Sequence, residues 1–196
     1  MKHYAITGGI GSGKSTVLRL FKGLGIPTFS ADDSAKYAME NNPEVKQNII
    51  ALFGDKSYTN GALNRELLAE QVFHNKPKLE ALNAVVHPAA RVAYEQWRDA
   101  QDAPYTMYEV SILFELLAQD RFDGVLLVVT AEEERIKRVQ IRDKVTEDNV
   151  RARIKNQWPD EQKLPLADFV IENTDLSNTE VQVNALHQQL LEESKQ

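Results

Sequence analysis

Short apolar runs alternate with longer amphipathic stretches along this chain of 196 residues. After the first run, the apolar residues between Val17 and Leu24 recur at the i, i+3, i+4, i+7 spacing of a helix. The run at 124–130 is continuously apolar, which is typical of a parallel strand covered on both faces. The predicted strands lie at 3–7, 26–29, 105–110, 124–130 and 168–171. Their alternation with helices predicts an α/β fold, in which a parallel sheet of about five strands is flanked by helices and joined by right-handed crossovers.

A largely helical block interrupts this alternation at about 45–101. Its predicted elements are a helix over 43–53 that ends at Gly54, a turn at Asn60-Gly61 and a long helix over 79–97. Pro88 lies inside the long helix, and because proline lacks an N–H and clashes with the preceding turn, we expect a kink or a restart there. The block is too long for a plain crossover, which indicates a helical insertion over the active face.

The segment between the first strand and the first helix reads Gly-Gly-Ile-Gly-Ser-Gly-Lys-Ser over 8–15 and matches the template G-x-x-x-x-G-K-[ST] at every fixed position. In that template, glycines let N–H groups converge on phosphate oxygens, the lysine reaches the β- and γ-phosphates, and the hydroxyl ligates Mg²⁺. The alternative is a chance match, but the strand–loop–helix order favours a P-loop and a P-loop NTP hydrolase type of fold. The predicted ATP-binding residues are Gly9, Gly11, Ser12, Gly13, Lys14, Ser15 and Thr16, with Ser15 as metal ligand.

Two aspartates, Asp32 and Asp33, follow the second predicted strand. Ligands of open parallel sheets bind beyond the carboxyl ends of the strands, where this tip and the P-loop would both lie. We therefore expect Asp32 to take part in the chemistry. For Asp33 we favour a structural role as N-cap of the following helix.

Composition narrows the class of protein. The net charge of −6 and the pI of about 5.3 argue against a nucleic-acid-binding protein, which normally needs a basic face. Cysteine is absent, which excludes disulfides and thiolate sites and is compatible with a reducing cytosol. No apolar leader precedes the first strand and no run approaches 18 apolar residues. We expect a cytoplasmic protein that binds neither nucleic acid nor membrane.

A basic segment over 135–155 stands out in this acidic chain, with eight basic and three acidic residues. Arginines such as Arg138 and Arg142 can bind phosphate oxygens in a bidentate manner, so the segment indicates a lid over nucleotide phosphates. The alternative is a solvated helix face with i, i+4 ion pairs.

The P-loop alone predicts nucleotide phosphate binding and no particular reaction. A GTPase would carry an N-K-x-D motif and a motor domain an apolar run followed by adjacent acidic residues, and neither is present. A kinase of a small metabolite needs an acceptor site, a helical insertion that covers it and an arginine-rich lid. The chain has a candidate for each.

The same residues resemble the dephospho-coenzyme A kinase family, which is related to the nucleoside monophosphate kinases. Its P-loop is matched over 7–15, its Asp-Ala-Asp tip at Ala31-Asp32 and its late Ala-Asp-x-Val-Ile-x-Asn at 167–173. Further matches are Leu63-Asn64-Arg65, Leu82-Asn83 with His87-Pro88, Glu109-Val110 with Leu113-Phe114-Glu115, and Arg138, Arg142-Asp143, Arg153 and Gln157. The resemblance spans almost the full chain.

The resemblance implies transfer of the ATP γ-phosphoryl group to the ribose 3′-hydroxyl of dephospho-CoA, with Mg²⁺. The implied catalytic residues are Asp32, Lys14 and Arg138; ATP contacts extend to Arg142 and Asn173; and dephospho-CoA is held by Asp32, Arg65, His87 and Glu109. It also implies one P-loop kinase domain over 1–196, divided into a core of 1–44, 102–142 and 166–196, a substrate-binding insertion of 45–101 and a lid of 143–165.

Four positions depart from the family pattern, namely Ser30, Asn64, Ser111 and Asp175. None removes an expected catalytic group. Two alternatives remain open, another P-loop kinase of nucleoside monophosphates or related metabolites and a nucleotide-binding regulatory module without turnover. His87 taken alone is as compatible with a structural histidine as with a substrate ligand. The residues leave the oligomeric state open, with a monomer favoured.

Overall fold

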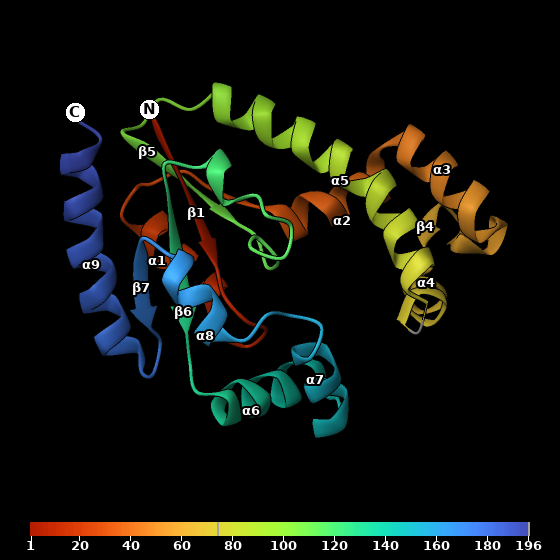
Figure 1. Ribbon diagram of the computed structural model, residues 1–196. Coiled ribbons are helices and arrows are strands. Elements are labelled where there is room, and N and C mark those ends of the chain that lie inside the picture. Colours follow the sequence, from red (N-terminus) through yellow and green to blue (C-terminus); the bar gives the residue numbers. More distant parts are fainter. Residues whose placement is uncertain (74, 196) are drawn as a thin grey trace. The chain divides into compact units, whose positions relative to one another are not determined.

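Five parallel strands form the sheet of the computed structural model, in the order β2-β5-β1-β6-β7 (Figure 1). Their bounds are β1 (Lys2–Thr7), β2 (Thr28–Ser30), β5 (Tyr105–Glu109), β6 (Gly124–Val129) and β7 (Phe169–Glu172). The structure describes residues 1–73 and 75–195. Because β1 pairs with both β5 and β6, the loop that follows it leaves from the middle of the sheet. The prediction of a parallel α/β sheet is confirmed.

The chain divides into two units, which we call the sheet unit (1–30 and 101–196) and the helical unit (31–100). The helices of the sheet unit are α1 (Lys14–Gly23), α6 (Glu132–Asp143), α7 (Glu147–Ile154), α8 (Asp160–Lys163) and α9 (Leu176–Glu193), with short 3-10 turns at Gln119–Arg121 and Leu164–Leu166. Among the described residues, no helix is both long and apolar enough to cross a membrane.

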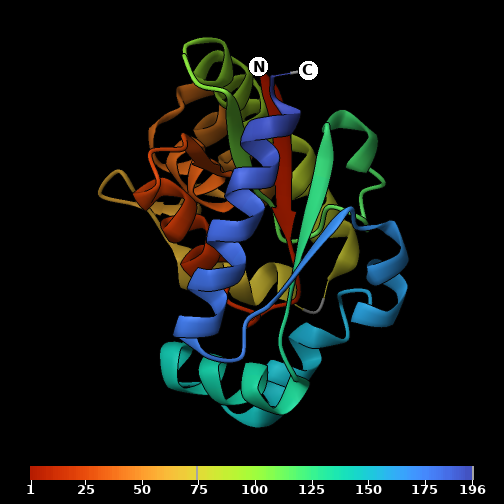
Figure 2. The same cartoon turned by 90° about the vertical axis from the view of Figure 1, so that its left-hand side faces the viewer.

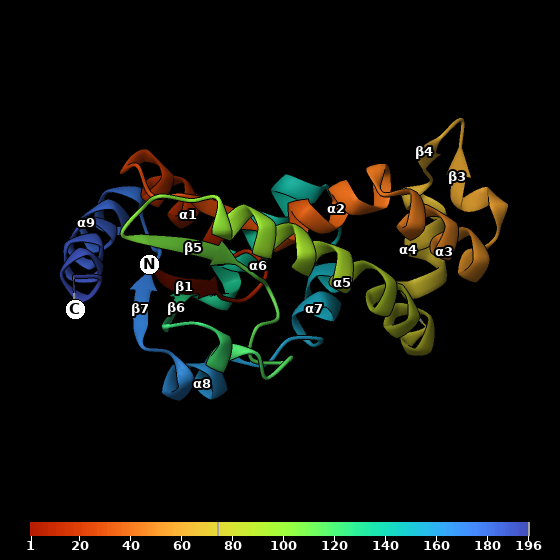
Figure 3. The same cartoon turned by 90° about the horizontal axis from the view of Figure 1, so that it is seen from above.

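Helices α1 and α9 pack together on one face of the sheet, while α8 lies on the other (Figures 2 and 3). Val17 and Phe21 of α1 are fully buried against β1, β5 and α9, as their helical spacing predicted. A buried hydrogen bond of 2.6 Å joins the Tyr105 hydroxyl to His187 Nδ1 and so fastens α9 to β5. This core holds β1 and α1 in place, and the P-loop connects them.

The helical unit has a hydrophobic cluster of its own. It contains α2 (Ala31–Asn41), α3 (Pro43–Phe53), α4 (Arg65–Phe73) and α5 (Lys76–Asp99), with a 3-10 turn at Asp55–Ser57 and a hairpin of β3 (Tyr58–Thr59) and β4 (Ala62–Leu63). The predicted turn is confirmed, because Asn60 (φ 52°) and Gly61 (φ 81°) form the two-residue loop of that hairpin. The buried members of the cluster are Ala38, Val45, Ile49, Phe53, Leu68 and Val86.

Of the two outcomes expected at Pro88, a kink or a restart, the restart is wrong. Helix α5 runs through Pro88 without ending, so no helix N-terminus opens there. Proline lacks the N–H that would donate a helical hydrogen bond, and its ring clashes with the preceding turn. However, Val86 and Ala90 on either side are buried against the other helices of the unit. Packing along the long helix outweighs this local penalty.

The expected position of the two aspartates also needs correction. Strand β2 ends at Ser30 and α2 begins at once with Ala31, so Asp32 and Asp33 lie in the first helical turn. Neither is at the N-cap position, and Asp33 forms an exposed ion pair of 2.9 Å with Lys36. A carboxylate in the first turn interacts favourably with the helix dipole without capping the helix. Aspartate suits both the N-cap position and the first turn, so the sequence pattern did not distinguish the two.

Candidate active site

The loop over 8–13 connects the end of β1 to the start of α1. Gly13 has the left-handed φ of 90°, and no side chain of the described residues caps α1 there. A helix N-terminus that follows a glycine-rich loop is a ready anion site, because backbone N–H groups and the helix dipole point toward the ligand. The predicted phosphate-binding residues therefore lie on one continuous loop and the first turn of α1.

The Lys14 side chain folds back over this loop. Its ammonium donates hydrogen bonds to the carbonyl oxygens of Gly8, at 2.8 Å, and Gly9, at 3.3 Å, and the residue is buried. The positive charge therefore lies over the loop, next to the amides that would hold phosphate. A charge held in a partly desolvated site acts more strongly than one in bulk water.

Ser15 and Glu109 lie side by side at the carboxyl end of the sheet. The Ser15 hydroxyl donates a hydrogen bond of 2.9 Å to Glu109 Oε1, and Glu109 is only 7% exposed. Glu109 is the last residue of β5 and pairs with Ile6 of β1, one residue before that strand ends. The resemblance placed Glu109 with substrate, whereas its observed partner is the predicted metal ligand.

Asn173, which directly follows β7, holds the loop over 8–13 through its side-chain amide. Its Nδ2 donates 2.8 Å to the carbonyl of Ser12, and its Oδ1 accepts from the Thr179 hydroxyl at 2.9 Å, so both ends of the buried amide are occupied. A Cβ at Gly13 would collide with this amide, which is why glycine is needed there. Asn173, predicted as an adenine contact, thus also shapes the phosphate loop.

Arg138 lies next to Asn173, on α6. Its Nη2 donates to the carbonyls of Asn173, at 3.1 Å, and Thr174, at 3.2 Å. Its Nη1 lies 3.4 Å from the Thr130 hydroxyl, which in turn donates 3.0 Å to the carbonyl of Ser12. The structure therefore brings the Arg138 guanidinium within one residue of the phosphate loop. Thr130 was missed because a lone threonine after a strand carries no signal of its own.

Arg142 is held by its neighbour in sequence. It donates to both carboxylate oxygens of Asp143, at 2.7 and 3.0 Å, and Arg153 donates to the same carboxylate at 2.7 Å. These bonds, with that of Arg142 first, lower the pKa of Asp143. The side chain of Arg142 is 63% exposed, so this ion pair is screened by solvent and costs little to exchange for another anion.

The positive charge over 135–155 is largely compensated by acids outside that window. Of the acids before the window, Glu132 and Glu133 pair with Arg151 and Glu134 pairs with Lys137, while Glu147 inside the window also pairs with Arg151. Over 132–160 the chain has eight basic and seven acidic residues. A sequence window that begins at 135 counts the basic residues and omits the three glutamates directly before it.

Three predicted acceptor-site residues, Asp32, Arg65 and His87, belong to the helical unit. His87 lies on α5; partial desolvation lowers its pKa, and the Asp32 carboxylate on α2 partly opposes that shift, so the two side chains lie within electrostatic reach. Arg65 opens α4 and forms an exposed ion pair of 2.6 Å with Glu40. The fold brings Asp32 and His87 together although 54 residues lie between them in the sequence.

Two of the departures from the family pattern cap helices. Asn64 Oδ1 accepts from the backbone N–H of Leu67 at the start of α4, and Asp175 Oδ1 accepts from that of Asn178 at the start of α9. Side chains of this type satisfy N–H groups that a helix leaves unpaired. These two departures from the family pattern therefore have a local structural role as helix caps.

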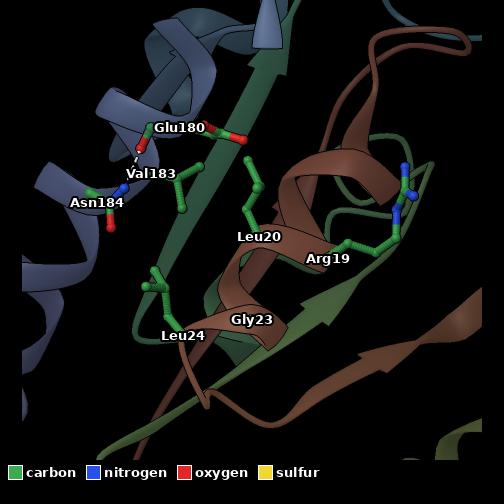
Figure 4. A pocket seen from close by; sticks show the side chains of 7 residues that line it. All are labelled: Arg19, Leu20, Gly23, Leu24, Glu180, Val183 and Asn184. Atoms are coloured by element: carbon green, nitrogen blue, oxygen red, sulfur yellow. Dashed lines mark hydrogen bonds between the residues drawn. The ribbon is translucent and has the colours of Figure 1, made fainter. Parts of the chain in front are cut away.

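A shallow groove lies outside this site, between α1 and α9 (Figure 4). It has a volume of about 260 Å³ and is lined by Arg19, Leu20, Gly23, Leu24, Glu180, Val183 and Asn184. The groove follows the C-terminal half of α1, whereas the phosphate loop precedes the N-terminus of that helix. It contributes nothing to the candidate active site.

Comparison with known proteins agrees with this geometry. A dephospho-CoA kinase from Salinibacter ruber is 38% identical over 177 residues, which cover 88% of this chain and 89% of that protein. A crystal structure of a protein from Thermus thermophilus is 37% identical, with a TM-score of 0.86 and coverage of 97% of both chains. A dephospho-CoA kinase from Campylobacter jejuni is 28% identical, with a TM-score of 0.71 and the same coverage.

The family model for dephospho-CoA kinase matches residues 3–178, which include all of the sheet except Lys2, the phosphate loop and the helical unit. Nine-tenths of the chain thus match one family model. The chain belongs to the dephospho-CoA kinase family.

Proposed function

We propose that the protein transfers the γ-phosphoryl group of ATP to the ribose 3′-hydroxyl of dephospho-CoA, giving CoA and ADP. The observation that supports this best is the family match over residues 3–178 of a chain whose phosphate loop has Lys14 folded over it and Ser15 bound to Glu109. In the reaction, a bond forms between the 3′-oxygen and the γ-phosphorus while the bond to the ADP oxygen breaks. The hydroxyl proton passes to a base.

The sheet unit supplies the nucleotide side of this reaction. Amides over 9–15 bind the phosphates, Lys14 offsets their charge, and Arg138, Arg142 and Asn173 complete the ATP contacts. Phosphoryl transfer depends mostly on positioning and on stabilising charge at the phosphoryl oxygens, which these groups are suited to do. Residues 143–165 are proposed to act as a lid, because the solvent-accessible pairs of Arg142 and Arg153 with Asp143 can exchange for phosphate.

Magnesium fits the Ser15 and Glu109 pair. Mg²⁺ binds oxygen ligands, usually one or two carboxylates together with substrate phosphates, and a hydroxyl next to a carboxylate meets that need. Among the described residues, no cluster of three or more histidine, cysteine or acidic side chains could hold a metal ion by itself. The bound ion would neutralise charge on the β- and γ-phosphates, while Ser15 and Glu109 orient it.

The helical unit supplies the acceptor side. Asp32 is the proposed base, and His87 and Arg65 are proposed to bind dephospho-CoA within the insertion of 45–101. The Asp32 carboxylate acts to raise the pKa of His87, which supports a shared acceptor site on α2 and α5. The protein is proposed to be cytoplasmic and monomeric. Its residues 1–196 are proposed to form one kinase domain.

The decisive experiment measures ADP release from ATP and Mg²⁺ with dephospho-CoA, and in parallel with AMP and CMP. Formation of CoA in step with ADP, at a rate far above that with either nucleotide, is expected. Faster turnover of AMP or CMP would assign the protein to nucleoside monophosphates. Binding of ATP without turnover of any acceptor would identify a regulatory module.

A further inference from the structure

We propose that Gln157 and Arg135 are positioning residues that hold the phosphate loop in its ATP-binding shape through one residue, Ile10. This inference rests on the proposed use of the loop for ATP. Ile10 occupies a variable position of the phosphate-binding template, between Gly9 and Gly11, which are both expected to contact phosphate. Its N–H, its carbonyl and its side chain are each held by the segment over 135–157.

The N–H of Ile10 is held by Gln157. It donates a hydrogen bond of 2.7 Å to Gln157 Oε1, and Gln157 Nε2 donates 3.1 Å to the carbonyl of Ser111. Ser111 comes two residues after Glu109, the partner of Ser15. One amide side chain therefore ties the phosphate loop to the strand end that carries the proposed metal-site carboxylate.

The carbonyl of Ile10 is held by Arg135. Arg135 Nε donates 3.0 Å to Ile10 O, and its Nη1 lies 3.3 Å from Asp160 Oδ2. The residue is 5% exposed, and a Cβ at Gly9 would collide with its guanidinium. Glycine at position 9 thus makes room for a buried arginine, in addition to any contact with phosphate.

Gly11, the next glycine of the loop, also lies against α6. A Cβ on it would come within 2.6 Å of the Arg135 carbonyl oxygen and 2.9 Å of Val139 Cγ2. The Ile10 side chain packs on the cluster of Ile136, Val139 and Val150 from α6 and α7. Helices that carry the proposed lid arginines are therefore packed directly on the loop.

This arrangement matters for binding because a glycine-rich loop has many accessible conformations when it is not held. Ordering such a loop around a ligand costs conformational entropy, and holding it beforehand removes part of that cost. Loss of the contacts to Ile10 should therefore weaken nucleotide binding more than it weakens the fold. A purely structural glutamine would change stability alone.

The test compares Gln157→Ala with Gln182→Ala. Like Gln157, Gln182 accepts one backbone hydrogen bond and donates another; it accepts from Glu172 N at 3.0 Å and donates to Glu172 O at 2.9 Å. Both glutamines are half-buried. ADP affinity is measured by calorimetry in EDTA and in Mg²⁺, thermal stability by circular dichroism, and hydrogen exchange over peptides that contain 8–13. Wild-type protein is titrated first.

We expect Gln157→Ala to weaken ADP binding roughly three- to tenfold, as loss of two neutral hydrogen bonds implies, and to speed exchange over 8–13. Gln182→Ala should lower Tm to a similar degree and leave ADP affinity within twofold. Gln157→Glu provides a second variant; it keeps an acceptor for Ile10 but loses the donor to Ser111 and adds negative charge, so it should bind ADP no better than Gln157→Ala.

Wild-type protein that binds ADP, with both alanine variants binding it equally well, overturns the inference and leaves the proposed function intact. Wild-type protein that fails to bind ADP overturns both. Unchanged exchange over 8–13 in Gln157→Ala also contradicts the role of Gln157, whatever the affinity.

Discussion

The hydroxyl of Ser15 donates a hydrogen bond of 2.9 Å to Glu109 Oε1, joining residues 94 positions apart at the carboxyl end of the sheet. The bond exists because β5 lies beside β1, so that the last residue of one strand meets the loop that follows the other. The bond joins the buried Glu109 carboxylate to Ser15, which is proposed to hold Mg²⁺. We therefore predict that a change at Glu109 alters the dependence of turnover on Mg²⁺.

Glu109→Gln keeps an oxygen that can accept from Ser15 and removes the charge. We expect a higher Mg²⁺ requirement and a loss on the order of 10–100-fold in metal affinity or turnover, typical of a group that orients a metal ligand. Turnover measured against Mg²⁺ concentration checks this, with Glu172→Gln, at the exposed end of β7, as control. An unchanged Mg²⁺ profile would return Glu109 to a role in substrate binding.

Lys14→Ala should abolish detectable phosphoryl transfer, because its ammonium offsets charge at the β- and γ-phosphates in a partly desolvated site. The matched control is Lys22→Ala, an exposed lysine in the last turn of the same helix. Steady-state ADP release provides the measurement. Turnover of Lys14→Ala within tenfold of wild type would contradict the assignment.

Asp32→Asn should lower turnover by roughly 10²–10⁴-fold with little change in ligand affinity, as expected for a positioned base. Asp33→Asn, which disturbs an exposed ion pair with Lys36, should cost about 0.5 kcal/mol or less in stability and leave turnover near wild type. Kinetics of both variants with dephospho-CoA decide between the aspartates. A collapse of activity in Asp33→Asn, with activity retained in Asp32→Asn, would move the base by one residue.

Arg142→Ala should raise KM for ATP roughly tenfold or more while changing KM for dephospho-CoA less, because a charged hydrogen bond to phosphate is lost. Lys137→Ala removes another exposed cation of α6, one that pairs with Glu134, and serves as control. Equal effects of the two variants would indicate that Arg142 belongs to a solvated helix face.

Stability should fall as the solution becomes acidic, in part through His187. Burial lowers the pKa of His187, so the unfolded chain takes up its proton first, near pH 6.5, and the native state follows at lower pH. The contribution of this group is complete above about pH 6.5 and is lost as pH falls through the native pKa. Its hydrogen bond with Tyr105 Oη adds a second group that protonation would disturb.

Urea unfolding of wild type and His187→Gln from pH 8 to pH 5 isolates this effect, because other groups, including His87, titrate in both proteins. His187→Gln should be less stable at pH 8 by about 1 kcal/mol, the worth of one buried hydrogen bond. The difference should shrink toward pH 5. A constant difference across this range would exclude a role for His187 in the acid response.

Local features of the fold follow from the sequence because they depend on neighbours along the chain. A continuous apolar run identified β6, helical spacing identified α1, and Asn60-Gly61 identified a turn, since glycine and asparagine tolerate positive φ at both positions of that turn. Order and spacing were also enough for the phosphate loop, whose groups all come from one segment.

Errors arose where a local rule competed with packing. Pro88 should end a helix by its own chemistry, yet buried neighbours carry α5 through it. The strand predicted over 26–29 placed Asp32 and Asp33 in a polar tip after it, but α2 begins directly after β2 ends at Ser30, so both aspartates are helical. Neither outcome can be read from a window of a few residues.

Sequence alone therefore determined the α/β class, the family resemblance and the glycine-rich loop that is predicted to bind phosphate. Only the tertiary structure decided which distant groups hold that loop. Gln157 lies 147 residues from Ile10 and Glu109 lies 94 from Ser15, and a hydrogen bond over such a separation depends on strand order and helix packing. The physical reason is that a side chain's partner is set by which elements the hydrophobic core brings together, and no spacing along the chain records it.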